Sequence, residues 1–370
     1  MVPVFVSTAV VLSTFVLSAQ AKVGDLIPEF EFPSPIGHDG RTQLSDLFGG
    51  PVLIAGWRTH LVDGMHAGRF AYELSRKFGN KGLTIVMVDR NPWRGDSQYG
   101  ALGFWMLFPA KPPILYSSST KSTKSQLPID WTVPRDDRSA VLIGVDGRVI
   151  AVGTVENVRQ PEKKGDFRAR LRALIKAEIG KRSNGWGSDK VAVKARKLAF
   201  GMGKLAKAMA LLESSEHRSE DQVAAHREIE RHLDSRCKAI RLLLAEARYG
   251  DAQQAHELLR KACQGHPGFE STAAKLAAEI AAVATKSEIK LEKALLKLLS
   301  PLIGRPAKGK AHVKILGQLR LFAKKHEGSK VADRARKLDY LAQSRICSVL
   351  GVKWDFVDEQ TAKFLAKHSR

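Results

Sequence analysis

Polar side chains that could take part in chemistry gather in residues 58–66, directly after an apolar run. His60, Asp63 and His66 are residue types that bind metal ions or transfer protons. Their spacing matches no established set of metal ligands, so we predict no metal site and no cofactor. The same stretch contains no cysteine, which leaves it without a thiolate nucleophile. No Gly-x-Ser-x-Gly motif occurs in the chain, so a serine hydrolase is not indicated.

All the thiols lie in the second half of the chain, at Cys237, Cys263 and Cys347. They form no CxxC pair and have no metal-ligand spacing. Each lies among apolar residues at helical spacing, which favours buried structural thiols. An exported protein could instead pair two of them and leave one free.

The elements around residues 58–66 have the pattern of a βαβ unit. Residues 51–57 and 83–88 are short apolar runs typical of buried strands. Between them, apolar residues recur at the spacing of one helix face, at Ala67, Phe70, Ala71, Leu74 and Phe78. We therefore expect two parallel strands joined by a helix, with any ligand or reaction site between Arg58 and Met65, where the first strand gives way to the helix.

Several short motifs follow one another in the order of a known family. They are Val23-Gly-Asp25, Pro28-Glu-Phe30, Asp39-Gly-Arg41, Leu44-Ser-Asp-Leu47, Gly50-Pro-Val-Leu-Ile54, Trp57 and the run 138–150. This order resembles the redoxin group of the thioredoxin fold, which includes the alkyl hydroperoxide reductase/thiol-specific antioxidant proteins. The resemblance covers about residues 22–180. It implies an α/β thioredoxin-like domain, a central mixed sheet flanked by helices, and a thiol-dependent oxidoreductase or peroxidase activity.

The residues that would carry this activity do not match. Trp57 and Thr59 agree with the family's Trp-x-Thr-x-Cys-x-x-Cys pattern, whose two cysteines fall on Leu61 and Gly64. A peroxiredoxin-style alignment places the reactive cysteine at Gly64 or Met65. Methionine is a thioether and cannot cycle through a disulfide. The resemblance therefore predicts a degenerate redox site.

Other residues near this site are candidates for a remaining binding role. Arg138 stands about where the family has its cis-proline, and it is either a remnant of the arginine that stabilises the reacting thiolate or a surface residue paired with Asp136 and Asp137. Asp63 suits the cap of the following helix. Trp57, Thr59, His60 and Asp63 are our candidate binding residues.

The first domain is expected to end with a hairpin and a helix. Residues 141–145 and 148–152 flank Asp146-Gly147, a favoured hairpin turn. Asp166 is placed to cap a helix that we expect to end at Gly180. Residues 181–188 are rich in Gly, Ser and Asn and read as a linker, so the predicted domains are 22–180 and 189–370.

The second domain has helical periodicity throughout, which predicts an all-α architecture. The predicted helices are 189–213, 219–248, 251–264, 270–283, 286–300, 309–326 and 330–345. The stretch 249–274 resembles a tetratricopeptide-type helix pair, and 321–332 resembles the turn between such helices. Stacked helix pairs and a plain helical bundle both remain open.

The first 21 residues have no charged side chain and end in Ala19-Gln20-Ala21, the small-x-small pattern of a signal-peptidase site. We predict an exported protein, periplasmic or extracellular, with a retained N-terminal anchor as the alternative. No later run is long and apolar enough to cross a bilayer.

The chain has a formal charge of +22, and residues 181–370 hold 38 Lys and Arg against 21 Asp and Glu. These basic residues alternate with acidic ones and few aromatics interleave with them, so no specific nucleic-acid module is indicated. We expect a binding or scaffolding protein whose helical domain contacts a partner protein or an anionic polymer outside the cell. The alternative is an oxidoreductase that uses the cysteines of the helical domain. A third class is a structural assembly module.

Overall fold

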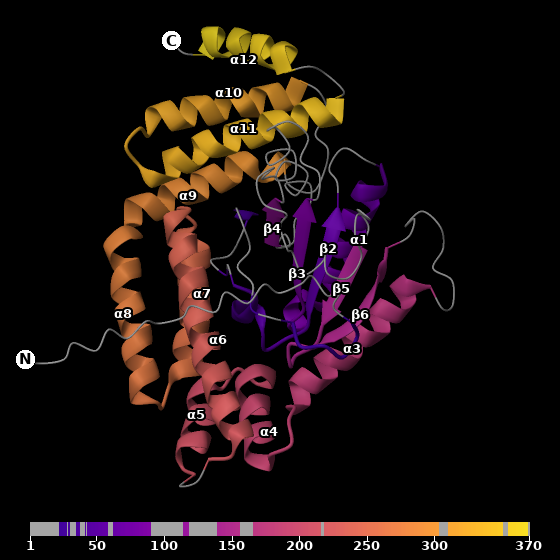
Figure 1. The fold of residues 1–370 in the computed structure, drawn as a ribbon. Helices are drawn as coiled ribbons and strands as arrows, with labels where there is room; N and C mark the ends of the chain where they lie inside the picture. Colours follow the sequence, from indigo (N-terminus) through magenta and orange to yellow (C-terminus); the bar gives the residue numbers. More distant parts are fainter. Residues whose placement is uncertain are drawn as a thin grey trace, which may run out of the picture.

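The computed structural model describes residues 22–27, 29, 35–37, 41, 43–57, 62–89, 114–117, 139–155, 166–215, 218–302, 310–350 and 354–368. Within these residues a β-sheet with covering helices forms the first half, and α-helices form almost all of the second half (Figure 1). The predicted fold class, an α/β thioredoxin-like half followed by an all-α half, is confirmed.

Six strands form one mixed sheet in the order β1-β4-β3-β2-β5-β6. Their bounds are β1 Pro35–Gly37, β2 Val52–Trp57, β3 Thr84–Asp89, β4 Ile114–Ser117, β5 Ser139–Ile143 and β6 Val149–Thr154. Strands β2, β3 and β4 are mutually parallel, whereas β5, β6 and β1 are antiparallel to their neighbours. Because α1 (Val62–Phe78) lies between β2 and β3 in the chain, the predicted βαβ unit is confirmed.

The two faces of the sheet are covered by different elements, since successive side chains of a strand point to opposite faces. One face packs against α1 and α3 (Phe167–Asn184) through Leu53, Ala55, Phe70, Leu74, Met87, Leu171 and Ile175. The other face packs against the 3-10 turn η1 (Leu44–Leu47) through Leu44, Leu47, Val52, Ile54, Val86 and Val141. Both faces of the sheet are therefore buried, as expected for a sheet whose central strands are parallel.

The hairpin and helix that end the α/β half also follow the prediction in outline. β5 and β6 pair antiparallel around a turn in which Gly147 has a φ of +79°. The Asp166 side chain caps α3 by accepting from the Arg168 backbone N–H at 2.8 Å. The expected end of this helix at Gly180 is wrong, because α3 continues to Asn184. It stops at Gly185, which has a φ of +84° and where a Cβ would collide with the Val193 carbonyl.

The helical half contains nine α-helices and one π-type turn in the part of the chain that the structure describes. They are α4 Lys190–Arg196, η3 Lys197–Gly201, α5 Leu205–Glu213, α6 Glu220–Ala245, α7 Tyr249–Cys263, α8 Pro267–Val283, α9 Lys286–Leu299, α10 Lys310–Lys325, α11 Lys330–Leu350 and α12 Trp354–His368. The single helix predicted for 189–213 is wrong: it breaks at Met202–Lys204, where Gly203 has a φ of +68°. The prediction missed α12.

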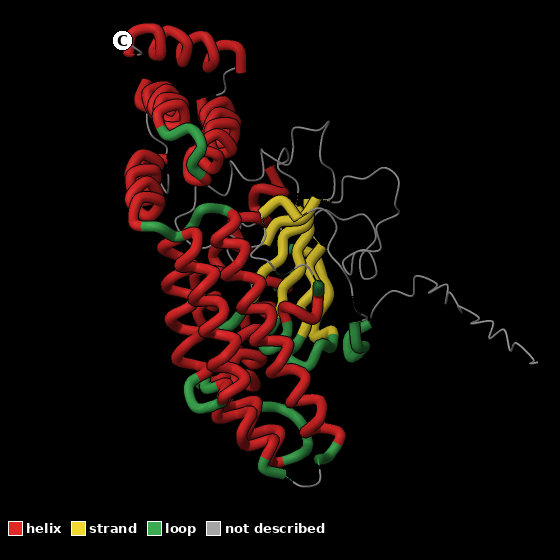
Figure 2. The backbone as a smooth tube through the Cα atoms, turned by 90° about the vertical axis from the view of Figure 1, so that its left-hand side faces the viewer, coloured by secondary structure: helices red, strands yellow, loops and turns green. Residues whose placement is uncertain are grey.

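Most helices of this half pack against the next one in the chain, whereas α9 packs against α7, α10 and α11; Figure 2 shows the helices beside the sheet. One apolar cluster runs through them from Ala192 in α4 to Ala342 in α11. Helices α7 and α8 form the pair predicted for 249–274, separated by Gly265 and capped by His266. Whether such pairs are tetratricopeptide repeats stays a prediction, as does the domain boundary at 181–188, of which 181–184 belong to α3.

The two halves are joined by buried polar contacts at η1. Asp46 is buried and accepts from the Lys238 Nζ of α6 at 3.0 Å. The Ser235 hydroxyl of α6 donates to the Asp46 carbonyl oxygen at 2.9 Å. Within the α/β half, Arg182 Nε of α3 donates to the carbonyl oxygen of Gly49, just after η1, at 2.9 Å. The α/β half is thus fastened to the long helix α6 through the face of the sheet opposite α1.

Candidate functional site

The edge of the sheet at which parallel strands end is the expected place for a ligand. The register brings Trp57, Asp89 and Ser117, the last residues of β2, β3 and β4, side by side along this edge. Because β5 runs antiparallel to β2, its first residue Ser139 lies at the same edge. The backbone therefore places three more polar residues beside Trp57 than the motif analysis identified.

The predicted redox positions lie at this edge, at the start of α1. This helix begins at Val62, so Asp63, Gly64 and Met65 occupy its first turn. Asp63 is therefore inside the helix, and the prediction that it is the cap is wrong by one or two residues. The first-turn N–H groups and the helix dipole favour a negative charge here. The position has the electrostatics that activate a thiol, and the sequence places no cysteine there.

Four of the predicted site residues lie outside the described residues: Thr59, His60, Leu61 and Arg138. Arg138 directly precedes β5, and residues 58–61 connect β2 to α1. The structure therefore brings together Trp57 and the first turn of α1 and leaves the roles of these four residues as predictions. Among the side chains that the structure describes, no three His, Cys, Asp or Glu gather closely enough to hold a metal ion.

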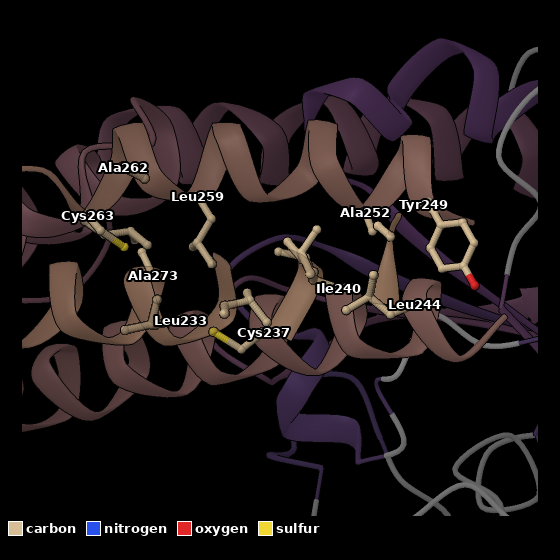
Figure 3. Close-up of a cluster of buried hydrophobic side chains, with 14 of the residues drawn as sticks. Leu233, Cys237, Ile240, Leu244, Tyr249, Ala252, Leu259, Ala262, Cys263 and Ala273 are labelled. Carbon is tan, nitrogen blue, oxygen red and sulfur yellow. The ribbon is translucent and has the colours of Figure 1, made fainter. Parts of the chain in front are cut away.

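Two of the three thiols lie in a different environment, between α6 and α7. Cys237 and Cys263 are free, buried and surrounded by apolar side chains, as Figure 3 shows. For these two residues the prediction of buried structural thiols is confirmed. Cys347 belongs to α11, where the structure gives no account of its side chain.

Burial changes the acidity of both thiols in the direction opposite to activation. Desolvation raises the pKa of Cys263 to about 11, and the neighbouring Arg236 offsets only part of this effect. Desolvation likewise raises the pKa of Cys237. At pH 7 a thiol with a pKa of about 11, as for Cys263, is a thiolate in about one molecule in ten thousand. These side chains also lie on the α6 side of the sheet, whereas α1 covers the opposite face.

A third polar group, missed by the sequence analysis, lies next to the junction of the two halves. The His232 ring of α6 packs edge-on against Phe200, with ring centroids 5.2 Å apart. Burial lowers the pKa of His232 to about 3, and the positive charges of Arg236, Arg182 and Arg41 act in the same direction. His232 is thus neutral at any physiological pH. No local pattern could have shown this, because its neighbours other than Arg236 (Arg41, Arg182 and Phe200) lie far from it in the chain.

A comparison with protein-family models and one with curated proteins find no match for this chain. Solved structures do resemble its first half. A protein assigned as the thiol:disulfide interchange protein DsbE from Chlorobium tepidum is 21% identical, with a TM-score of 0.33 over 43% of this chain and 99% of that one. Peroxidoxin BcpB from Mycobacterium tuberculosis is 18% identical, with a TM-score of 0.31 over 42% of this chain and 97% of that one.

The thioredoxin domain of a thiol-disulfide oxidoreductase from Bacteroides vulgatus is similar at 15% identity, with a TM-score of 0.31 over 42% of this chain and 98% of that one. Identities and TM-scores at this level carry no functional argument, so the assignment rests on the topology. A β2-α1-β3 unit followed by an antiparallel hairpin and a helix, in the strand order β3-β2-β5-β6, is the core of the thioredoxin fold. The first half is thioredoxin-like. This is the fold that the redoxin relationship, predicted from the motifs, requires.

None of the helices that the structure describes combines the length and the apolar composition needed to cross a bilayer. The predicted signal sequence, residues 1–21, lies outside the described residues. Export therefore stays a prediction.

Proposed function

We propose that this protein is an exported redoxin-fold binding protein that does not catalyse thiol chemistry. In this proposal the α/β half is a rigid platform and the helical half is the interaction module. The observation that carries it is the lack of cysteine at Leu61, Gly64 and Met65, the three positions where the fold would activate one.

The alternative, an oxidoreductase that uses the thiols of the helical half, is disfavoured by burial. A thiol–disulfide exchange needs an accessible thiolate. Cys237 and Cys263 are buried, with a raised pKa in each case. Neither property suits an attacking or a resolving cysteine.

Two assays separate these functions: consumption of hydrogen peroxide with dithiothreitol as donor, and reduction of insulin disulfides. We expect the wild-type chain to turn over no faster than the matched variant Cys237→Ser/Cys263→Ser/Cys347→Ser or buffer alone. Turnover by the wild type that disappears in this variant would overturn the proposal. The deciding measurement is the turnover of the wild-type chain, so the test remains valid even if the triple variant folds poorly.

The surface of α9 supports a partner with negative charge. Lys286, Lys290, Lys293 and Lys297 recur at intervals of four, three and four residues, so they share one exposed helix face. No ion pair involves any of the four among the described residues. A row of unpaired cations on one face attracts anionic polymers or acidic protein surfaces.

This partner class is tested by titrating the full chain with polyglutamate at low and physiological salt. We expect binding that weakens as salt rises and that falls at least tenfold in Lys290→Glu/Lys293→Glu. The matched control Lys324→Glu/Lys325→Glu makes the same charge change on α10. Equal binding by all three proteins would contradict a role for α9.

Export is tested on the protein purified from the cell envelope and medium of its native host. We expect intact-mass measurement to show a chain that begins at Lys22, after cleavage behind Ala21. A chain that retains residues 1–21 and fractionates with membranes would support the anchored alternative instead.

A further inference from the structure

A groove on the α/β half combines apolar and cationic side chains, and the proposed function gives it no role. It lies between the C-terminal end of α1, with the turn η2 (Gly79–Lys81) that follows, and the middle of α3, and its volume is about 620 Å³. Its apolar lining comes from Phe78, Ala173 and Ile179. Four cationic side chains, Lys77, Lys81, Arg172 and Lys176, surround this floor.

Most of the positive charge of the groove is not paired with an acidic side chain among the described residues. Lys77, Lys81 and Lys176 form no ion pair with any described residue. Lys77 Nζ instead lies 5.4 Å from the centre of the Phe78 ring. Among these four cations, Arg172 pairs with a described carboxylate, that of Glu73, at 3.6 Å. The groove therefore carries about three uncompensated positive charges around an apolar floor.

Arg172 is held in place by contacts on its other side. Its guanidinium lies over the Phe70 ring at 4.8 Å from the centroid, and Phe70 is buried in the core below. A planar cation fixed by stacking loses little freedom when it binds an acidic group. It is thus a preorganised donor at one end of the groove, with the three flexible lysines along the rest.

The size of the groove selects the kind of ligand. Its α3 wall runs from Arg172 to Gly180, which is about 12 Å at the rise of an α-helix. A volume of 620 Å³ lies in the range of small-molecule sites, whereas a stable protein interface needs a much larger surface.

We propose that this groove binds a small anionic amphiphile, a molecule with an apolar body about 12 Å long and an acidic head group. The apolar body packs beside the buried Phe78 and removes the exposed surface of Ala173 and Ile179 from water. The acidic head pairs with Arg172 or with the lysines opposite it. This inference is independent of the role proposed for the helical half.

The test is calorimetric titration of the full chain with decanoate below its micelle concentration, with decanol and acetate as matched ligands. We expect one decanoate per chain, with a Kd at least tenfold lower than that of either matched ligand. Decanol binding as tightly as decanoate would overturn the role of the cations. Acetate binding as tightly would overturn the role of the apolar floor.

Two variants of α3 locate the site. Ala173 and Ala177 are both exposed and lie one helical turn apart, and only Ala173 lines the groove. We expect Ala173→Glu to weaken decanoate binding at least tenfold and Ala177→Glu to leave it unchanged. Lys77→Glu/Lys176→Glu should weaken it similarly, while Lys290→Glu/Lys293→Glu on α9 should not.

A final arm separates a free ligand from a membrane. Sedimentation with vesicles of anionic phospholipid, in a chain that binds no monomeric decanoate, would overturn the proposal in favour of a lipid surface. Decanoate binding that is equal in Ala173→Glu and Ala177→Glu would place the ligand elsewhere and also overturn it.

Discussion

The start of α1 and the interface between α6 and α7 hold complementary halves of what a thiol enzyme needs. The first turn of α1 lies at the carboxyl edge of the sheet and has unpaired N–H groups that stabilise an anion, but no sulfur. The α6–α7 interface has two sulfur atoms in an apolar core, where burial raises the pKa of Cys237 and Cys263. The comparison shows that the placement of a thiol, rather than its presence, decides whether a fold can use it.

Modification rates give the largest contrast. At pH 7 we expect iodoacetamide to label Cys263 in the native chain about 10⁴-fold more slowly than in the chain unfolded in urea, because burial both raises its pKa and blocks access. Peptide mass spectrometry reports each site separately. Rapid labelling of Cys263 in the native chain would mean that the α6–α7 interface opens and that burial does not keep this thiol unreactive.

A cysteine introduced at the start of α1 should react faster than the buried cysteines of the α6–α7 interface. The thiol introduced by Met65→Cys should have a pKa below the ordinary value of about 8.5, because the first turn of α1 stabilises its thiolate. Its alkylation at pH 7 should exceed that of Cys263 by about 10³-fold. The pH dependence of the rate measures the pKa directly. The control Ala177→Cys places a thiol on exposed α3, where no such lowering is expected.

The sequence was sufficient for the elements built by local patterns. The spacing of Phe70, Leu74 and Phe78 predicted α1 because one buried helix face is a short-range property. The helix end expected at Gly180 failed because a glycine in a helix costs only about 1 kcal/mol, which the flanking contacts of α3 exceed.

What the sequence could not predict depends on residues that are far apart in the chain. Asp46 and Lys238 are 192 residues apart, and no local motif links them. Helix α12 was not recognised from its own residues, although seven of its fifteen residues are apolar. It is held instead by tertiary contacts such as the Arg320–Asp358 ion pair at 3.1 Å and the fully buried Thr361. The polar edge formed by Asp89 and Ser117 likewise appears only once the strand order is known.

The ion pair at the junction keeps α6, and with it Cys237, on the side of the sheet opposite α1. Asp46→Ala removes a buried carboxylate that accepts from Lys238, so we expect the free energy of unfolding to fall by about 2 kcal/mol. The estimate is below that of a fully buried pair because Lys238 is 45% exposed. Urea unfolding followed by circular dichroism measures it.

The matched control for this junction is Glu279→Ala, which removes an exposed pair with Arg241 at 2.8 Å. Because both side chains are more than 40% exposed, its loss should cost less than about 1 kcal/mol. Equal effects of Asp46→Ala and Glu279→Ala would mean that the junction adds nothing beyond a surface pair. The two regions would then be free to move relative to one another.

The last expected effect is the pH dependence contributed by His232, which lies on α6 next to the junction of the two halves. The pKa of His232 is about 3 in the folded chain because of burial and the charges of Arg236, Arg182 and Arg41, and 6.5 is its ordinary value. Between these values the unfolded chain binds a proton that the folded chain does not, so stability is present above pH 6.5 and is lost as the pH falls.

From pH 7 to pH 5 this one group should lower the free energy of unfolding by about 1–2 kcal/mol. In His232→Gln the loss should be smaller by that amount, because glutamine does not titrate. Urea unfolding of both proteins at the two pH values measures the difference. An identical pH dependence would show that His232 is protonated in the folded chain. In that case the junction would be hydrated and α6 would not hold its thiols in a dry core.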